Sequence, residues 1–185
     1  MYHIKHDKRA QASTELICAG LLVCMKEKPF ARITITDVQR ASTVSRSTFY
    51  RNFDCLEDVL ALLCDRGFQA VFAARSALPP ERRGGLAKAV FQYWFCNSTV
   101  LEALVEIHRT DILFDSLRRS SGLIQALQPM VDDPARFDYF VAIITSSMIG
   151  VLTVWVEHGK TETEDQMVQK LTSAFIEMAI LEMPG

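Results

Sequence analysis

The stretch of sequence that decides the fold is residues 34–53, which read Thr-Ile-Thr-Asp-Val-Gln-Arg-Ala-Ser-Thr-Val-Ser-Arg-Ser-Thr-Phe-Tyr-Arg-Asn-Phe. Thr34 and Asp37 have the spacing of a capping box, in which the hydroxyl and the carboxylate satisfy free amides of a first helical turn. This box predicts a short helix over about residues 35–42. Ser45 is placed to cap a second short helix, so the stretch predicts two helices joined by a tight turn.

The second of these helices, over about residues 46–52, divides into two faces. Phe49 and Phe53 are four residues apart and fall on one face, which we expect to be buried, with Val44 completing a hydrophobic staple. The opposite edge is polar and basic and carries Arg46, Ser47, Thr48, Tyr50 and Arg51. Arginine can fork onto guanine in the major groove, and hydroxyl groups can donate to phosphates. The pattern indicates a helix-turn-helix that binds DNA.

The order Ile-Thr-x-x-x-Val, followed by Val-Ser-Arg-Ser-Thr-Phe-Tyr-Arg-Asn-Phe, resembles the tetracycline-repressor (TetR) family of bacterial one-component regulators. The specific part of the resemblance covers about residues 10–62, and the remainder is similar in helix content and length. The resemblance implies a homodimeric repressor of a palindromic operator that is released by a small molecule. The DNA-binding residues that it and the capping pattern imply are Thr36, Ser45, Arg46, Ser47, Thr48, Tyr50 and Arg51.

Three positions depart from the habit of the resembling family. Thr43 stands where the turn usually has glycine, and Ser42 stands where alanine is usual. A β-branched residue at positive φ is an outlier, so we expect either a shifted turn or a strained one. Leu56 stands where a lysine commonly approaches a phosphate, and its presence predicts one phosphate contact fewer.

Charge is distributed unevenly along the chain, although the net charge is only −2. The first 53 residues hold nine Lys/Arg against four Asp/Glu, whereas the remainder holds eleven against eighteen. Lys5, Lys8 and Arg9 form a basic arm before or at the start of the first helix and are further DNA-binding candidates. A basic first part attached to an acidic body is typical of a DNA-binding unit on a sensor, and the alternative is a chance asymmetry of solvated faces.

The class is all-α, because helical spacing dominates and the six prolines and eight glycines cluster between helical stretches. We expect a helix-turn-helix domain over residues 1–54 and a helical ligand-binding and dimerisation domain over residues 55–185. The first helix should bury Ala12, Leu16, Ala19 and Val23, and Asp54 with Glu57 should cap the fourth. Predicted helices lie at about 8–27, 35–42, 46–52, 55–76, 86–96, 98–107, 110–127, 135–158 and 162–182.

Residues 139–156 carry no charge, so a membrane span is one reading. Polar residues interrupt the stretch and no basic flank accompanies it, which favours a helix covered at a subunit interface and no membrane partner. The alternative is that the last two helices only complete a monomer core. The predicted interface residues are Ile144, Met148, Val151, Trp155, Leu171, Phe175 and Met178.

A sensor site is predicted where aromatic residues repeat in the body. The candidates for an apolar pocket are Phe68, Phe72, Phe91, Trp94, Phe95 and His108. Such a pocket would take a small apolar ligand held by one or two polar anchors, His108 or Arg109 being the nearest. The alternative is that these aromatic side chains are plain core.

Metal, cofactor and catalytic sites are not predicted. The five cysteines contain no Cys-x-x-Cys pair, and Cys96 with His108 across a helix break fixes no catalytic geometry. Free thiols fit a reducing cytosol, so we expect a cytoplasmic protein. Nothing in the sequence resembles an oxyanion loop or a phosphate-binding glycine run, so we expect a regulator that is not an enzyme. One alternative keeps the DNA-binding module and gives the body only dimerisation or a protein partner. Another is a helical interaction protein or enzyme, which would show no salt-dependent DNA binding.

Overall fold

The computed structural model describes residues 2–3 and 8–181, and within these ranges the chain is helical with no β-strand. The α-helices are α1 (Lys8–Glu27), α2 (Ile35–Ser42), α3 (Arg46–Asn52), α4 (Leu56–Ser76), α5 (Leu86–Cys96), α6 (Ser98–Glu106), α7 (Thr110–Arg119), α8 (Ser121–Leu127), α9 (Pro134–Glu157) and α10 (Glu164–Leu181). Three short 3-10 turns lie at Phe30–Arg32, Pro80–Arg82 and Gln128–Met130. The predicted all-α class is confirmed.

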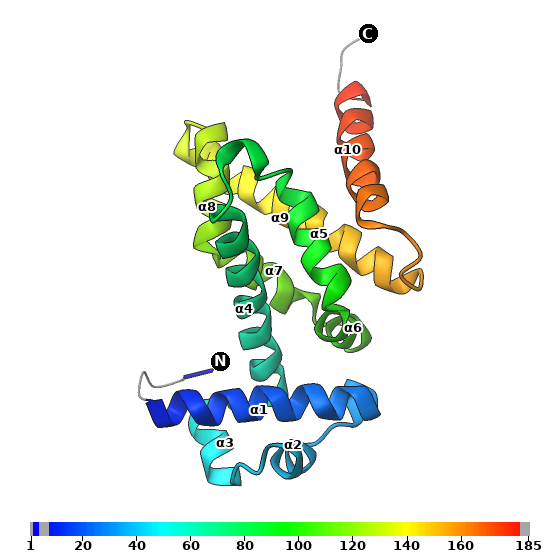
Figure 1. Ribbon diagram of the computed structural model, residues 1–185. Coiled ribbons are helices and arrows are strands. Elements are labelled where there is room, and N and C mark those ends of the chain that lie inside the picture. Colours follow the sequence, from blue (N-terminus) through cyan, green and yellow to red (C-terminus); the bar gives the residue numbers. More distant parts are fainter. Residues whose placement is uncertain (1, 4–7, 182–185) are drawn as a thin grey trace.

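The helices form a small unit and a larger body joined by α4 (Figure 1). Helices α1, α2 and α3 lie together at one end, and α4 rises from them into the body. Helices α5 to α8 pack on α4, and α9 packs on α6 and α7. Helix α10 stands at the side of the body, where it contacts α5 and α9. The arrangement places α3 at the end of the molecule away from α8 and α10.

The buried face of α1 differs from the predicted one. Ala12, Leu16, Ala19 and Val23 are all exposed. The face that packs on α2 and α4 instead consists of Thr14, Ile17, Cys18, Gly20, Leu21 and Cys24. Gly20 decides this orientation, because a Cβ at this position would lie 2.8 Å from the Ser42 Cβ and 3.1 Å from the Val38 carbonyl oxygen. The backbones of α1 and α2 approach so closely that only a residue without a side chain fits there.

Two other local expectations are wrong. The helix expected over 110–127 is divided at Ser120, whose extended backbone (φ −64°, ψ 119°) ends α7 and begins α8. The side chains of Asp54 and Glu57 do not cap α4, whose N-cap is Cys55. Instead the Asp58 carboxylate accepts from the Asp54 amide at 2.9 Å, so the cap comes from one turn inside the helix.

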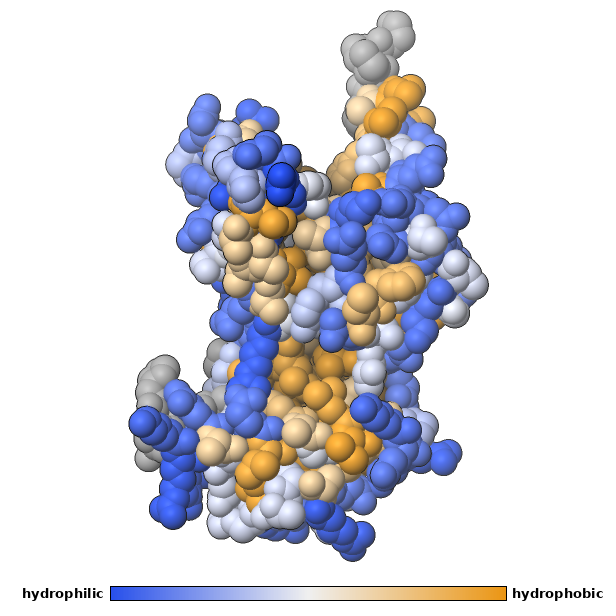
Figure 2. Space-filling view, viewed as in Figure 1, coloured by the Kyte–Doolittle hydropathy of each residue, from blue (hydrophilic) through white to orange (hydrophobic). Residues whose placement is uncertain are grey.

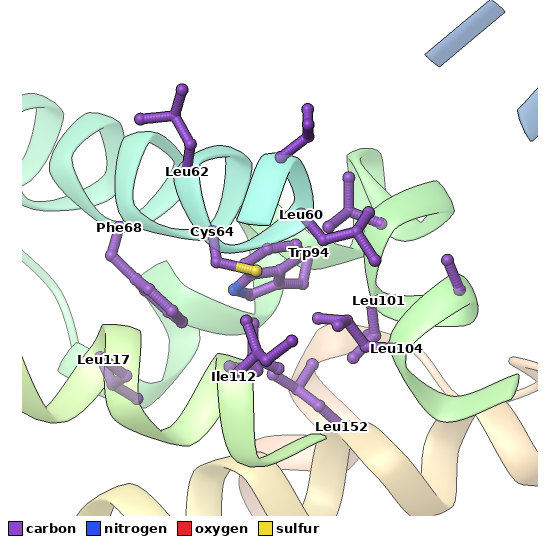
Figure 3. Close-up of a cluster of buried hydrophobic side chains, with 14 of the residues drawn as sticks. Leu60, Leu62, Cys64, Phe68, Trp94, Leu101, Leu104, Ile112, Leu117 and Leu152 are labelled. Carbon is purple, nitrogen blue, oxygen red and sulfur yellow. The ribbon is translucent and has the colours of Figure 1, made fainter. Parts of the chain in front are cut away.

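The core of the body is built from one face of α4 and the helices around it (Figure 3). Phe68 and Trp94 meet edge to face with ring centroids 5.5 Å apart. Around them the close-up shows Leu60, Leu101, Leu104, Ile112, Leu117 and Leu152, which come from α4, α6, α7 and α9. Burial of apolar surface on this scale is the main stabilising contribution to such a fold.

Polar contacts hold the first three helices against the body. Arg66 of α4 donates to the Glu15 carboxylate of α1 at 2.5 and 3.1 Å. The Phe30 amide, in the turn after α1, donates to the Glu106 carboxylate of α6 at 3.1 Å. These contacts connect α4 to α1 and α6 to the turn that precedes the helix-turn-helix.

Helix α9 is the single described helix that is long and apolar enough to cross a membrane, judged by length and composition alone. Its inner face packs in the protein, where Val141, Thr145, Met148, Ile149, Leu152 and Trp155 are buried. The charge-free stretch within it, residues 139–156, thus reflects in part the core of the body.

Candidate nucleic-acid interface

The cap of α2 is formed as the sequence predicts. The Asp37 amide donates to the Thr34 hydroxyl oxygen at 3.2 Å, and the Thr34 amide donates to the Asp37 carboxylate at 2.8 Å. Lys28 adds a third contact, since its ammonium group lies 2.7 Å from the same carboxylate. The hydrogen bonds from Lys28 and Thr34 hold the pKa of Asp37 well below its usual range. The start of α2 is therefore fixed to the end of α1.

The turn between α2 and α3 is strained. Thr43 adopts the left-handed conformation (φ 58°, ψ 14°) that glycine adopts freely and β-branched residues rarely adopt. Its hydroxyl donates to the Ser42 carbonyl oxygen at 2.7 Å, and the Val44 amide donates to the Ser42 hydroxyl oxygen at 3.3 Å. Hydrogen bonds of the Ser42 and Thr43 side chains therefore stabilise the turn. Of the two expected outcomes, a shifted turn or a strained one, the structure shows the strained turn.

Helix α3 is anchored by its cap and by two phenylalanines. The Thr48 amide donates to the Ser45 hydroxyl oxygen at 3.3 Å. Phe49 and Phe53 are completely or almost completely buried, with ring centroids 5.8 Å apart. Asn52 is buried as well, and its side-chain amide donates to the Thr48 carbonyl oxygen at 2.8 Å. These contacts leave the opposite edge of α3 facing away from the protein.

That outer edge carries the residues predicted to bind DNA. Arg46, Ser47, Tyr50 and Arg51 are exposed, Thr48 is half-buried beside the cap, and Thr36 is exposed on α2. The Arg46 guanidinium lies over the Tyr50 ring, 5.6 Å from its centroid, and donates to the Tyr50 hydroxyl oxygen at 3.4 Å. This contact restricts the Arg46 side chain before any ligand is bound, which lowers the entropy lost on binding. No carboxylate forms a described ion pair with either arginine of α3.

The basic arm is described in part. Lys8 and Arg9 are exposed in the first turn of α1, and Lys5 lies outside the described residues. Residues 2–3, which precede Lys5, contact the helix-turn-helix, because the His3 amide donates to the Asn52 carbonyl oxygen at 3.0 Å. The Tyr2 hydroxyl donates to the Asp65 carboxylate of α4, and burial together with this hydrogen bond raises the pKa of Tyr2 to about 12.

Leu56, where the resembling family often has a lysine, begins α4 as a buried residue with 8% of its surface exposed. It joins the core that also contains Phe49 and Phe53. The position therefore contributes packing energy, and its side chain has no group that could donate to a phosphate.

The structure separates the six residues predicted to bind a ligand. Phe68, Phe91 and Trp94 are closed in the core, Phe72 touches an open cleft between α4 and α8, and Phe95 and His108 are exposed. The Trp94 indole N–H is buried without a hydrogen-bond partner among the described residues. The six residues therefore do not line one common cavity.

The predicted interface residues also fall into two groups. Met148 and Trp155 are buried inside the protomer, where Trp155 stacks on Phe95 and donates its indole N–H to the Glu162 carbonyl oxygen at 3.0 Å. Ile144, Val151, Leu171, Phe175 and Met178 are half-buried or exposed. Several of them border an apolar groove of about 370 Å³ between α9 and α10, which Gly150 and Trp155 also line.

Sequence reasoning missed two features of this interface. The close approach of Gly20 to Ser42 had no predictive signal beyond the glycine itself, because its cause is a residue on another helix. The pairing of Arg46 with Tyr50 could have been found from their spacing, since residues four apart lie side by side on a helix.

Two solved structures share this fold over almost the whole chain. One is a TetR transcriptional regulator from Streptococcus agalactiae 2603V, 20% identical, with a TM-score of 0.56 over 91% of this chain and 96% of that chain. The other is described as a TetR-family transcriptional regulator from Syntrophomonas wolfei str. Goettingen, 17% identical, with a TM-score of 0.63 over 94% of this chain and 97% of that chain. No protein-family model and no curated protein matches the sequence. The chain therefore has the all-α fold of these TetR-family regulators.

Proposed function

We propose that the protein is a homodimeric transcriptional regulator that binds a palindromic DNA site through α3 and represses transcription until a small molecule releases it. The observation that carries the proposal is the outer edge of α3, where Arg46, Tyr50 and Arg51 project from a helix held by Phe49 and Phe53. A short helix with a buried inner face and a basic outer edge, at the end of a helical body, suits insertion into the major groove.

The charge of the two parts supports this orientation toward DNA. The first 53 residues carry a net charge of +5 and the remainder −7. Phosphates attract the first part and repel the second, so the molecule should approach DNA with α1 to α3 in front. Two of the cations counted in the first part, Lys8 and Arg9, are exposed at the start of α1.

The groove between α9 and α10 supports the homodimer. Val154 of α9 and Ile176, Met178 and Ile180 of α10 each have about half or more of their surface exposed. Figure 2 shows apolar side chains at the outer end of α10, and an apolar surface of this kind needs a partner. A second copy related by a two-fold axis would cover it and would present two α3 helices to the two halves of a palindrome.

The test is selection of bound fragments from the source genome at moderate salt, followed by binding measurements on the enriched site. Arg46→Ala should weaken binding by about 1–3 kcal/mol and relax the preference at one base pair. Tyr50→Phe should weaken binding less and equally on all sequences. Arg118→Ala, which alters an exposed arginine of α7 in the body, is the matched control and should leave binding unchanged. If Arg46→Ala and Tyr50→Phe bind the enriched site as tightly as Arg118→Ala and the wild type do, the DNA-binding role of α3 is refuted.

A second function, in which the body serves only dimerisation or a protein partner, is favoured by the sealed packing of Phe68, Phe91 and Trp94. These three side chains leave no room for an apolar ligand among them in the protomer. If operator affinity stays constant across a panel of small molecules while dimerisation is intact, this second function is the correct one.

A further inference from the structure

The connection between α4 and α5 gathers positive charge in the acidic part of the molecule. Eleven Lys/Arg lie after residue 53. Four of them line a single cleft of about 630 Å³ between α4, the turn at Pro80–Arg82 and α5, namely Arg75, Arg82, Arg83 and Lys88. No Asp or Glu lines this cleft. We call it the basic cleft.

Internal partners do not account for these charges. Lys88 is paired with Asp165 of α10 at 2.5 Å. Arg75, Arg82 and Arg83, however, form no ion pair with any described residue. Glu81 is the nearest acidic residue in the sequence, and it is exposed and does not line the cleft. Three arginines therefore keep an uncompensated charge around one cavity.

Arg75 carries a further sign of a missing partner. Its Nε–H is buried and has no hydrogen-bond partner among the described residues, while one of its terminal nitrogens donates to the Gly84 carbonyl oxygen at 3.4 Å. A buried donor without an acceptor costs free energy, which a small movement of the Arg75 side chain toward a bound anion would recover. An arginine fork is also the side chain best shaped for a carboxylate or a phosphate.

The start of α5 adds donors to the same place. Gly84 and Gly85 line the cleft, and Gly85 is the N-cap of α5 without any side-chain capping bond. Gly84 has φ +61°, a conformation that suits glycine and turns the chain into the helix. The free amides of a first helical turn favour an anion, and Lys88 of this turn lines the cleft.

The remaining wall of the cleft is mostly apolar. Gln92 is its polar member, and the others are Ala70, Val71, Ala74, Leu78, Ala89 and Tyr93. Figure 2 shows strongly hydrophilic and apolar residues side by side where α4 turns into α5. From this juxtaposition we infer that the basic cleft binds a small molecule with an apolar chain and an anionic head group. The head group lies against the arginines, and the chain lies along α4 and α5.

Bound DNA does not explain the basic cleft. Helix α4 has 21 residues, so its two ends are separated by about 30 Å, and the cleft is at the end away from α3. A DNA-binding surface there would leave α3 unused, and DNA would gain nothing from the apolar wall. The volume of the cleft is in the range of small-molecule sites.

The inference deepens the proposed function, because it names a ligand class, yet its test does not depend on DNA. Dodecanoate is titrated into the full chain by calorimetry below its micellar concentration, and dodecyl phosphate shows whether the head group is a carboxylate or a phosphate. Saturable binding of either probe is expected. Dodecanol, which lacks the charge, and acetate, which lacks the chain, should each bind at least about tenfold more weakly.

Variants locate the site. Arg75→Gln and Arg82→Gln should each weaken probe binding by about tenfold, and Ala74→Trp should weaken it by filling the apolar wall without changing the charge. Arg118→Gln on α7 is the matched control and should remain within about twofold of the wild type. Because Arg82 is exposed and unpaired, its variant tests the inference even if Arg75→Gln impairs folding.

Several outcomes would overturn the inference. Absence of saturable binding would do so, as would variants of Arg75 and Arg82 that bind like Arg118→Gln. Binding only to vesicles of phosphatidylglycerol, with no binding of free probe, would instead make the cleft a membrane-contacting patch. Operator affinity measured without any probe tests the proposed DNA binding separately. The ligand site in the basic cleft and the DNA-binding function can therefore each be refuted without the other.

Discussion

Replacement of Gly20 by alanine tests the packing on which the helix-turn-helix depends. A Cβ at this position would lie 2.8 Å from the Ser42 Cβ, 3.0 Å from the Ser42 nitrogen and 3.1 Å from the Val38 carbonyl oxygen. Two of these atoms are backbone, so no rotation of a side chain relieves the contact. Helix α2 must move away from α1, and α3 must move with it because the Thr43 turn joins them.

The size of the effect follows from two opposing contributions. Overpacking of a close contact costs about 1–3 kcal/mol. Alanine in the middle of a helix is favoured over glycine by about 1 kcal/mol. The net expectation is a loss of about 0–2 kcal/mol in the free energy of unfolding. For a chain of this length it corresponds to a decrease in Tm of up to roughly 8 °C.

Urea denaturation gives the free energy, and fluorescence anisotropy on the selected operator gives the DNA affinity. Ala19→Gly, at the neighbouring exposed position of α1, measures the propensity contribution alone and is the matched control. We expect Gly20→Ala to lose more DNA affinity than its stability change explains, since α3 is displaced in the folded protein. A more stable Gly20→Ala protein with normal DNA affinity would refute the close approach of α1 and α2.

Three further substitutions address other features. Thr43→Gly removes a left-handed β-branched residue and should stabilise the protein by about 1 kcal/mol in urea denaturation, whereas Thr43→Ala keeps a Cβ and should not. Asp37→Asn should lower the free energy of unfolding at neutral pH. Because the pKa of Asp37 in the folded protein lies below its ordinary 3.8, the difference in free energy of unfolding between variant and wild type should shrink as the pH falls below about 4. A difference that stays constant down to about pH 3 would contradict the cap. No atom lies within 4 Å of a Cβ on Gly150, so Gly150→Trp should fold but fail to dimerise in sedimentation equilibrium, while Ile124→Trp on α8 should still dimerise.

The helix-turn-helix could be predicted almost residue by residue, because its determinants are local. Caps at Thr34 and Ser45 satisfy amides within one turn, and the spacing of Phe49 and Phe53 fixes which edge of α3 is exposed. The capping of α2 and α3 and the left-handed Thr43 agree with what the sequence predicts. The sequence left open whether the turn at Thr43 is shifted or strained, and the structure shows that it is strained.

Features that depend on distant contacts could not be predicted with equal success. Periodicity predicts that α1 buries Leu16 and Val23, because large apolar residues outweigh glycine and cysteine in such a pattern, yet both side chains are exposed. The actual face is selected by Gly20 and its partner on α2. The basic cleft likewise could not be predicted from the sequence, because Arg75 and Lys88 are brought together only by the turn between α4 and α5.

The cysteines give the molecule a place for a spectroscopic label. Cys18, Cys24 and Cys64 are buried, and Cys55 is half-buried. Burial raises the pKa of these four thiols, that of Cys18 to about 11, so few of them are thiolate at neutral pH. Cys96 is exposed at the last residue of α5, the helix whose first turn borders the basic cleft. A maleimide fluorophore should therefore attach mainly to Cys96, and its emission would follow the movement of α5 in the native sequence, without the introduction of a new cysteine.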